Sequence, residues 1–118
     1  MSDSSVSTMP IDYLYLYRGI VTRVIDGDTV EIVADLGMYI KRTIRVRIGG
    51  YDAPELFRGT TEERAAGQRW KERLESLVLN QAVLLRTEKD KKSFDRYIAA
   101  IWRADDGLFI PEAMRDEQ

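Results

Sequence analysis

The stretch from Val24 to Val30 constrains the fold more than any other part of the chain. It reads Val-Ile-Asp-Gly-Asp-Thr-Val, so an Asp-Gly-Asp turn stands between two runs of β-branched residues. Asp-Gly pairs are typical of hairpin turns, and β-branched residues favour strands. The stretch therefore predicts a strand ending at Ile25, a second strand over residues 29–34, and the carboxylates of Asp26 and Asp28 at the turn between them.

A third strand is predicted over residues 39–50, because apolar and polar side chains alternate along it. One face would carry Ile44, Val46 and Ile48, and the other Thr43, Arg45 and Arg47. The turn before this strand is predicted at Asp35-Leu36-Gly37, since Asp and Gly favour turns. In the first strand, Tyr13, Tyr15 and Tyr17 would share a face, and Gly19 would mark a bend or bulge.

The second half of the chain predicts one helix and two more strands. Thr60-Thr61-Glu62-Glu63 has the form of a capping box, and helical spacing of apolar residues continues to about Leu79. Strands are predicted over residues 82–86 and 97–102, and Pro111 would open a last, truncated helix. Three strands, a helix and two strands is the element order of a five-stranded Greek-key barrel of the oligonucleotide-binding (OB) type, a mainly β fold.

Length and composition predict one domain. The chain has 118 residues with 44% apolar content, enough for a single core. Residues 1–10 are rich in Ser and Thr and are expected to form a flexible tail, which leaves residues 11–118 as the domain. The chain contains no cysteine and no histidine. Disulfides, thiolate metal sites and histidine bases are therefore excluded, and acid-base chemistry falls to Asp, Glu, Lys or Tyr.

The charge balance gives no general attraction to nucleic acid, because 18 Lys and Arg stand against 20 Asp and Glu. A polyanion would need a local patch. The first residues lack a basic start and an apolar run, and no segment approaches membrane-spanning length. We therefore expect an unexported, cytoplasmic protein without a membrane partner.

Four carboxylates stand in two pairs that the fold could bring together. Asp26 and Asp28 flank a glycine, while Asp52 and Glu55 flank Ala53-Pro54. If the first and third strands are neighbours, both pairs project from the same rim. Clustered carboxylates without histidine or cysteine suit Ca²⁺ or Mg²⁺ and not zinc. The alternative is that all four are ordinary turn residues.

Two arginines favour the first interpretation. Arg47 precedes Asp52 on the polar face of its strand, and Arg96 follows a basic loop at the start of the last strand. A guanidinium offers a bidentate fork to phosphate and stabilises the charge that builds up during displacement. Acids, a metal and two arginines would form a phosphodiester-cleaving site, although a single strand arginine is more often solvated or ion-paired.

Taken in order, three motifs together resemble the staphylococcal nuclease (thermonuclease-like) family over residues 18–114. They are Val-Ile-Asp-Gly-Asp-Thr, then Arg47 with Asp52-Ala53-Pro54-Glu55, then Phe94-Asp95-Arg96, with a helix between the second and third. The resemblance implies an OB-type barrel with a Ca²⁺-dependent nuclease site that cuts DNA and RNA and leaves 3′-phosphate ends. Mg²⁺ and Mn²⁺ are alternative ions.

The resemblance also implies a role for each matching residue. Asp28, Asp52 and the backbone carbonyl of Ala53 would ligate calcium, with Asp26 acting behind them through water. Glu55 would orient or deprotonate the attacking water. Arg47 and Arg96 would grip the scissile phosphate, and Arg96 would ease departure of the 5′ oxygen.

The chain departs from the family pattern at three places. Ala53 replaces a threonine whose backbone carbonyl alone is needed. Ser93 and Phe94 stand where the family offers a lysine and a tyrosine to a terminal phosphate, so Lys91 or Lys92 would have to substitute. The family's domain normally continues through a further helix, and the surface it would cover is expected to be closed by the tyrosine-leucine strand at 13–17 or by a second subunit.

Two other functions remain open from the sequence. One is a binding or structural module on the same barrel with weak or no catalysis. The other is an enzyme acting on sugar nucleotides through the Asp-x-Asp pattern, for which the chain is short. Whether the chain is a nuclease or a binding module, nucleic acid would be bound by local cations and one aromatic side chain. They are Lys41, Arg42, Arg45 and Arg47 on the third strand, Lys89, Lys91 and Lys92 in the basic loop, and Phe94 beside it.

Overall fold

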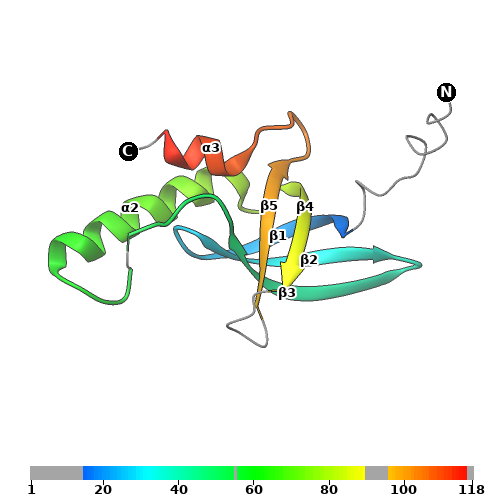
Figure 1. The fold of residues 1–118 in the computed structure, drawn as a ribbon, viewed down its shortest axis with the longest axis horizontal. Helices are drawn as coiled ribbons and strands as arrows, with labels where there is room; N and C mark the ends of the chain where they lie inside the picture. Colours follow the sequence, from blue (N-terminus) through cyan, green and yellow to red (C-terminus); the bar gives the residue numbers. More distant parts are fainter. Residues whose placement is uncertain (1–14, 55, 90–95, 117–118) are drawn as a thin grey trace, which may run out of the picture.

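A computed structural model describes residues 15–54, 56–89 and 96–116 of the chain. Five strands close into a barrel, and two helices pack against it (Figure 1). The elements are β1 (Leu16–Asp26), β2 (Thr29–Gly37), β3 (Ile40–Ile48), α2 (Thr61–Val78), β4 (Ala82–Lys89), β5 (Arg96–Arg103) and α3 (Ile110–Arg115).

Strand order around the barrel is β1-β2-β3-β5-β4, with β4 closing back onto β1. All neighbours are antiparallel except β3 and β5, which run parallel. The helix α2 between β3 and β4 makes that parallel pairing possible, because it carries the chain across the end of the barrel. The prediction of a five-stranded, mainly β barrel of OB type is confirmed.

The barrel core is filled by the alternating apolar residues of the strands. Val46 and Ile48 of β3 are fully buried, as are Ile32 of β2 and Leu85 of β4. Arg45 and Arg47 point to the opposite face, as the alternation predicts. The polar face of β3 is therefore available for chemistry on the outside of the barrel.

Gly19 does not mark the bulge predicted from the sequence. Strand β1 pairs regularly with β2 through Arg18, Gly19 and Ile20, and its irregularities lie between Val21 and Arg23 and between Val24 and Asp26. Gly19 faces the core instead. A Cβ atom there would lie 2.6 Å from Ile32 Cγ2, so glycine is required by close packing.

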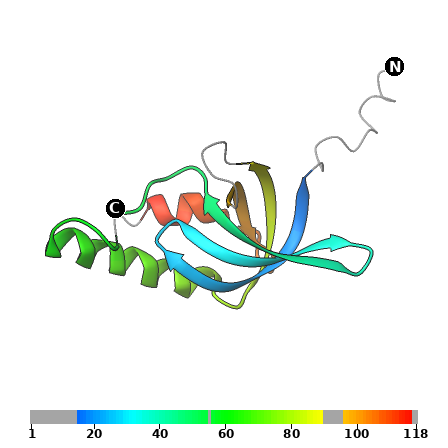
Figure 2. The same ribbon diagram turned by 90° about the horizontal axis from the view of Figure 1, so that it is seen from below.

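The β2–β3 hairpin extends beyond the barrel as a two-stranded arm (Figure 2). Its turn is not at Asp35-Leu36-Gly37, as predicted, because β2 continues to Gly37 and pairs there with Ile40. The loop is formed by Met38 and Tyr39, both with positive φ (56° and 61°). Two consecutive residues with positive φ are characteristic of a type I′ turn, which normally contains Asn-Gly. Met and Tyr disfavour this conformation, so residue propensities do not predict a turn at this position.

Helix α2 begins as the capping box predicts. The Thr60 hydroxyl accepts a hydrogen bond from the Glu63 backbone N–H, and the Glu63 side chain accepts one from the Thr60 backbone N–H. Leu74, Leu77 and Val78 are buried against the barrel. At the other end the helix stops at a Leu79 cap, followed by Asn80 in the left-handed conformation.

Helix α3 is short and packs against β5 and α2. Pro111 lies in its first turn, as predicted, and Ile110 and Met114 bury its apolar side. An Arg115 Nη1–H donates to the Gly50 carbonyl at 2.8 Å, which ties α3 to the segment after β3. In the described part of the chain, neither helix combines the length and apolar character needed to cross a bilayer.

The packing around Gly19 predicts that replacing this glycine by alanine destabilises the fold. Gly19→Ala is expected to lower the free energy of unfolding by about 1–3 kcal/mol, because the added methyl group overpacks the core against Ile32. A glycine that served only as a hinge would give the opposite result, since alanine in a strand is more stable than glycine. Urea denaturation would measure the change, with exposed Ile20→Val as the control expected to stay within about 0.5 kcal/mol.

Candidate phosphodiester site

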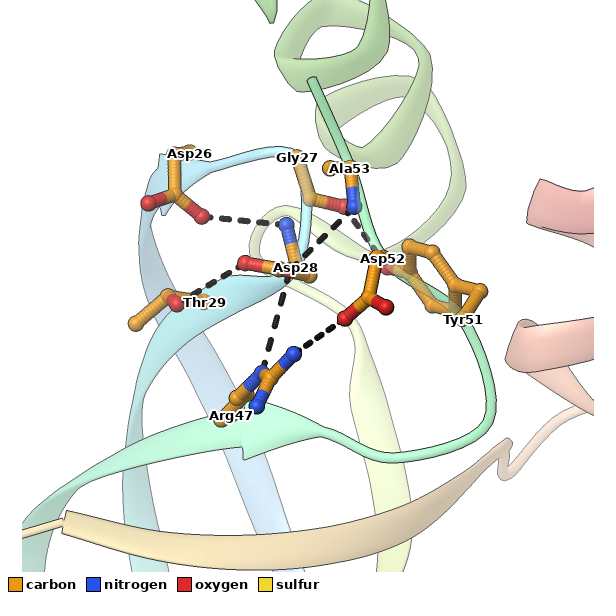
Figure 3. A network of polar contacts seen from close by, with 8 residues as sticks. All are labelled: Asp26, Gly27, Asp28, Thr29, Arg47, Tyr51, Asp52 and Ala53. Carbon is orange, nitrogen blue, oxygen red and sulfur yellow. Dashed lines mark hydrogen bonds and ion pairs between the residues drawn. The ribbon is translucent and has the colours of Figure 1, made fainter. Parts of the chain in front are cut away.

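The Asp-Gly-Asp turn joins β1 to β2 at the end of the barrel nearest α2 (Figures 1 and 3). Asp26 pairs with Thr29 across the turn, which leaves Gly27 and Asp28 as the loop. Asp26 Oδ1 accepts a hydrogen bond from the Asp28 backbone N–H at 3.0 Å, and the Thr29 hydroxyl donates to Asp28 Oδ1 at 3.2 Å. The Asp28 carboxylate is thereby held in one orientation, toward β3.

The segment that leaves β3 returns to this turn. The Ile48 backbone N–H donates to the Asp28 carbonyl at 2.7 Å, and the Ala53 backbone N–H donates to Asp28 Oδ2 at 3.3 Å. Strands β1 and β3 are not neighbours, because β2 lies between them. The two acid-bearing segments still meet, since Asp28 immediately precedes β2, the direct partner of β3.

Tyr51 and Gly27 fix the two segments together. The buried Tyr51 hydroxyl donates to the Gly27 carbonyl at 2.7 Å, and the Tyr51 ring stacks on Trp70 of α2 with centroids 6.0 Å apart. Gly27 allows this close approach, since a Cβ atom there would lie 2.6 Å from Ala53 Cβ and 2.8 Å from Trp70 Cβ. Neither role was foreseen from the sequence, which marked Gly27 only as a turn former.

Arg47 stands between the two acids (Figure 3). Its Nη2 forms an ion pair and hydrogen bond with Asp52 Oδ1, and its Nε lies 3.9 Å from Asp28 Oδ2. The Asp28 side chain is 16% exposed, whereas that of Asp52 is 83% exposed. The Arg47 guanidinium therefore bridges the largely buried carboxylate of Asp28 and the exposed carboxylate of Asp52. Beside it an open hollow of about 380 Å³ is lined by Arg47, Ile48, Gly49, Gly50, Tyr51, Asp52 and Ile98.

The charge of Asp28 is disfavoured in this environment. Burial, followed by the hydrogen-bonded side chain and negative charge of Asp26, raises the Asp28 pKa from 3.8 to about 6. The Ala53 backbone N–H and the Arg47 guanidinium act in the opposite direction but do not offset the rise. Burial and the two aspartates also raise the pKa of the Tyr51 hydroxyl, which therefore stays a hydrogen-bond donor. The site is short of positive charge.

The donors present fit a hard cation in type but do not form a finished cage. They are oxygen atoms only, as Ca²⁺ or Mg²⁺ prefers. Across residues 15–54, 56–89 and 96–116, however, no three carboxylates are close enough to hold an ion together. It is the N–H of Ala53, and not its carbonyl, that contacts Asp28 here. Metal binding would therefore require Asp52 to turn from Arg47.

Arg96 opens β5 on the strand next to β3. It pairs in register with Arg45, and Ile98 pairs with Arg47, so Arg45, Arg47 and Arg96 share the outward face of this parallel pair. The phosphate-gripping pair predicted from the sequence is thus placed on one surface. Lys41, two positions before Thr43, belongs to the same face of β3.

Arg42 does not belong with that cation patch. It pairs with buried Ala34, and its Nη1–H donates to the Tyr97 hydroxyl at 3.3 Å with the guanidinium 5.8 Å from the Tyr97 ring centroid. Strand alternation turns Arg42 toward the mouth of the barrel, away from Lys41 and Arg45. The patch expected from the sequence therefore divides between two faces.

Several predicted site residues lie outside the described residues. They are the proposed base Glu55, the basic-loop residues Lys91 and Lys92, and Phe94 with Ser93 before it. The Lys89 side chain is also not described. The flexible tail predicted for residues 1–10 and the tyrosine strand before Tyr15 fall in the same category.

Two known proteins have sequences similar to this chain. The chain is 35% identical over 85 residues to Protein ParB of Escherichia coli and 34% identical over 86 residues to micrococcal nuclease of Shigella flexneri. These matches cover 72% and 73% of this chain but 41% and 42% of the relatives, so the chain spans less than half the length of either. No family model matches the chain. The similarity to micrococcal nuclease supports a nuclease-like protein in general terms.

Carboxyl-carbon NMR titration would test the electrostatics of the turn. We expect Asp28 to titrate near pH 6 and its pKa to fall in Asp26→Asn, because the neighbouring carboxyl group is removed while burial remains. A carboxyl group with a raised pKa holds its proton more tightly when folded. Asp28 therefore contributes stability below pH 3.8 that is lost as pH rises through about 6. An Asp28 midpoint near 4, or no change in Asp26→Asn, would contradict this account; exposed Asp116→Asn is the control.

The Tyr51 hydroxyl is expected to stabilise the junction between the two segments. In Tyr51→Phe the buried Gly27 carbonyl loses its donor, which should lower the free energy of unfolding by about 1–2 kcal/mol. Tyr39→Phe, which removes a hydroxyl from a fully exposed ring, should change it by less than about 0.5 kcal/mol. Chemical denaturation of the two variants side by side measures the difference, and equal midpoints would show that the hydrogen bond adds nothing.

Proposed function

We propose that this chain is a member of the staphylococcal nuclease family and hydrolyses phosphodiester bonds in DNA, RNA or both with the help of Ca²⁺. The main support is the meeting of Asp28, Arg47 and Asp52 at one corner of an OB-type barrel, with the cation deficit at Asp28. The similarity to micrococcal nuclease over most of the chain adds to it.

In this proposal Asp28, Asp52 and the Ala53 carbonyl hold the ion, with Asp26 behind them. A bound divalent cation would offset the crowded carboxylates and polarise a phosphate oxygen. Mg²⁺ or Mn²⁺ would be accepted by the same oxygen donors. The raised Asp28 pKa supports an ion here, because an added positive charge removes the penalty for ionising that carboxyl group.

Arg47 links ion binding to substrate binding. In the structure its guanidinium neutralises Asp52, which is otherwise largely exposed. A phosphate group entering beside Arg47 would compete for that guanidinium, since arginine binds phosphate through the same planar fork. Asp52 would then be free to turn toward the ion, so ion and phosphate would favour one another.

The remaining roles come from the motif resemblance. Arg96 would face the same phosphate from the neighbouring strand β5 and ease departure of the 5′ oxygen, which would leave 3′-phosphate ends. Glu55 would take the proton of the attacking water. Lys91, Lys92 and Phe94 would contact the nucleotide beyond the scissile bond.

Digestion of denatured DNA would test this function directly. We expect cleavage with Ca²⁺, none with EDTA, and a loss of at least about 100-fold in kcat/KM for Arg47→Lys, which keeps the charge but not the bidentate fork. Glu55→Gln and Arg96→Ala should lose a similar factor. Arg69→Lys, on the exposed side of α2, is the control expected to retain full activity. Undiminished cleavage in EDTA or in Arg47→Lys would refute the mechanism, and end analysis of the products would test for the 3′-phosphate.

A weak or inactive binding module is the second candidate. It is favoured by the Arg47–Asp52 ion pair, which engages a proposed ion ligand within the protein itself. Oligonucleotide binding without cleavage under Ca²⁺, Mg²⁺ or Mn²⁺ would support this module over the nuclease.

A further inference from the structure

The tip of the β2–β3 arm exposes two large apolar side chains. Met38 is 92% exposed and Tyr39 fully exposed, more than any other large apolar residue in the described ranges. Leu36 and Ile40 beside them are also exposed. Hydrophobic side chains gathered at a projecting tip are typical of an interaction site.

The backbone at this tip is unfavourable for the residues that occupy it. Met38 and Tyr39 both have positive φ, a conformation in which a bulky side chain crowds its own backbone. An Asn-Gly pair would form the same type I′ turn without that strain. Local stability therefore does not explain why a methionine and a tyrosine stand here, whereas use of their side chains would.

A line of cations runs from this tip to the candidate site along the outward face of β3. Lys41 and Arg45 lead to Arg47, and Arg96 stands beside Arg45 on β5. A strand advances by about 3.3 Å per residue, so Tyr39 lies roughly 26 Å from Arg47 along the arm. That length matches several nucleotides of an extended strand, within the range of about 4–16 that an OB barrel covers.

Among the residues that the structure describes, the acids opposite these cations form hydrogen bonds with neutral groups and no ion pair with the cations. Asp35 faces Lys41 across the arm, but its Oδ1 accepts a hydrogen bond from the Gly37 backbone N–H at 2.9 Å. Glu31 faces Arg45, but its Oε1 accepts one from the Thr22 hydroxyl at 3.0 Å. Within the described residues, no ion pair occupies Lys41 or Arg45.

We propose that the β2–β3 arm is a guide for single-stranded nucleic acid, with a base stacked on Tyr39 and Met38 at the tip and the backbone following Lys41 and Arg45 to the site at Arg47. This deepens the proposed function and rests on it for the identity of the ligand. Stacking on an exposed ring and phosphate contacts along a basic strand are the two components of sequence-independent single-strand binding.

The charges favour this occupant over two others. A second copy packed with its β3 against this β3 would bring the two lines of cations together, which is repulsive. A lipid surface would contact the tip but not Arg45, which lies well back along the arm. Only an extended polyanion uses the tip, the line of cations and the site together.

A double substitution in the turn should increase thermal stability and weaken binding of single-stranded nucleic acid. Met38→Asn with Tyr39→Gly should raise the thermal unfolding midpoint by a few degrees, because strain is relieved. The same variant should weaken binding of a fluorescent twelve-nucleotide oligothymidylate at least about fivefold, because the stack is lost. Binding is measured in EDTA, so that it does not depend on cleavage. Tyr39→Phe should bind as the natural protein does.

Two controls localise the effect to the arm. Tyr15→Ser removes another exposed tyrosine with positive φ, just before β1 and off the arm, and should leave affinity unchanged. A three-nucleotide oligothymidylate is too short to reach from Arg47 to the tip, so its weaker binding should not respond to the turn variant. Ultraviolet crosslinking of a 5-iodouracil placed near one end of the longer strand should map to Tyr39.

Other outcomes would overturn the guide. Equal affinity of the turn variant and the natural protein for the twelve-nucleotide strand would do so, as would an equal loss for the short and long strands. A turn variant that changes only sedimentation would assign the tip to self-association, and one that changes only flotation with anionic vesicles would assign it to a membrane. Absence of cleavage by the natural protein with Ca²⁺ would refute the nuclease but not this binding result, so the two failures can be told apart.

Discussion

The junction between the β1–β2 turn and the segment after β3 determines the character of this protein. Three hydrogen bonds make it: Tyr51 to the Gly27 carbonyl, Ile48 to the Asp28 carbonyl, and Ala53 to the Asp28 carboxylate. They bring together acids that are 24 positions apart in the sequence, Asp28 and Asp52. The stack of Tyr51 on Trp70 extends the junction to α2. The positions of the two acid-bearing segments are thus set by backbone and aromatic contacts.

Features that depend on local sequence were predicted well. The alternation of Val46 and Ile48 with Arg45 and Arg47 fixes the two faces of β3, and the Thr60–Glu63 capping box fixes the start of α2. Both rest on neighbours within a few residues, so they can be read from the chain alone. The Asp-Gly-Asp hairpin belongs to the same class, because its turn residues and flanking strand formers agree.

Features that depend on distant contacts were not. Gly19 owes its place to the side chain of Ile32 on the next strand, and Gly27 to Ala53 and Trp70, none of which a local pattern reveals. The turn at Met38-Tyr39 was misplaced because those residues disfavour its backbone. The position of Arg42 was predictable, because strand alternation places it on the opposite face of β3 from Lys41. It was grouped with Lys41 and Arg45 only because these residues are close in sequence. The roles of the proposed ion ligands and of Arg96 remain predictions.

A protein with a net charge of −2 can bind a polyanion only if its charges are segregated, and the barrel does this through strand geometry. Alternation places Lys41, Arg45 and Arg47 on one face of β3, while parallel pairing adds Arg96 from β5. The acids Asp35 and Glu31 face Lys41 and Arg45 across the arm and lower the local positive charge, but in the described structure they form no ion pair with them. The cations still outnumber these two acids on this face. At the end of this line Arg47 meets Asp28 and Asp52, where positive charge is in deficit. The outward face of β3 thus has excess positive charge along the strand and excess negative charge at the end near Asp28 and Asp52. A phosphate backbone would be attracted to the first part, and a divalent cation would be attracted to the second.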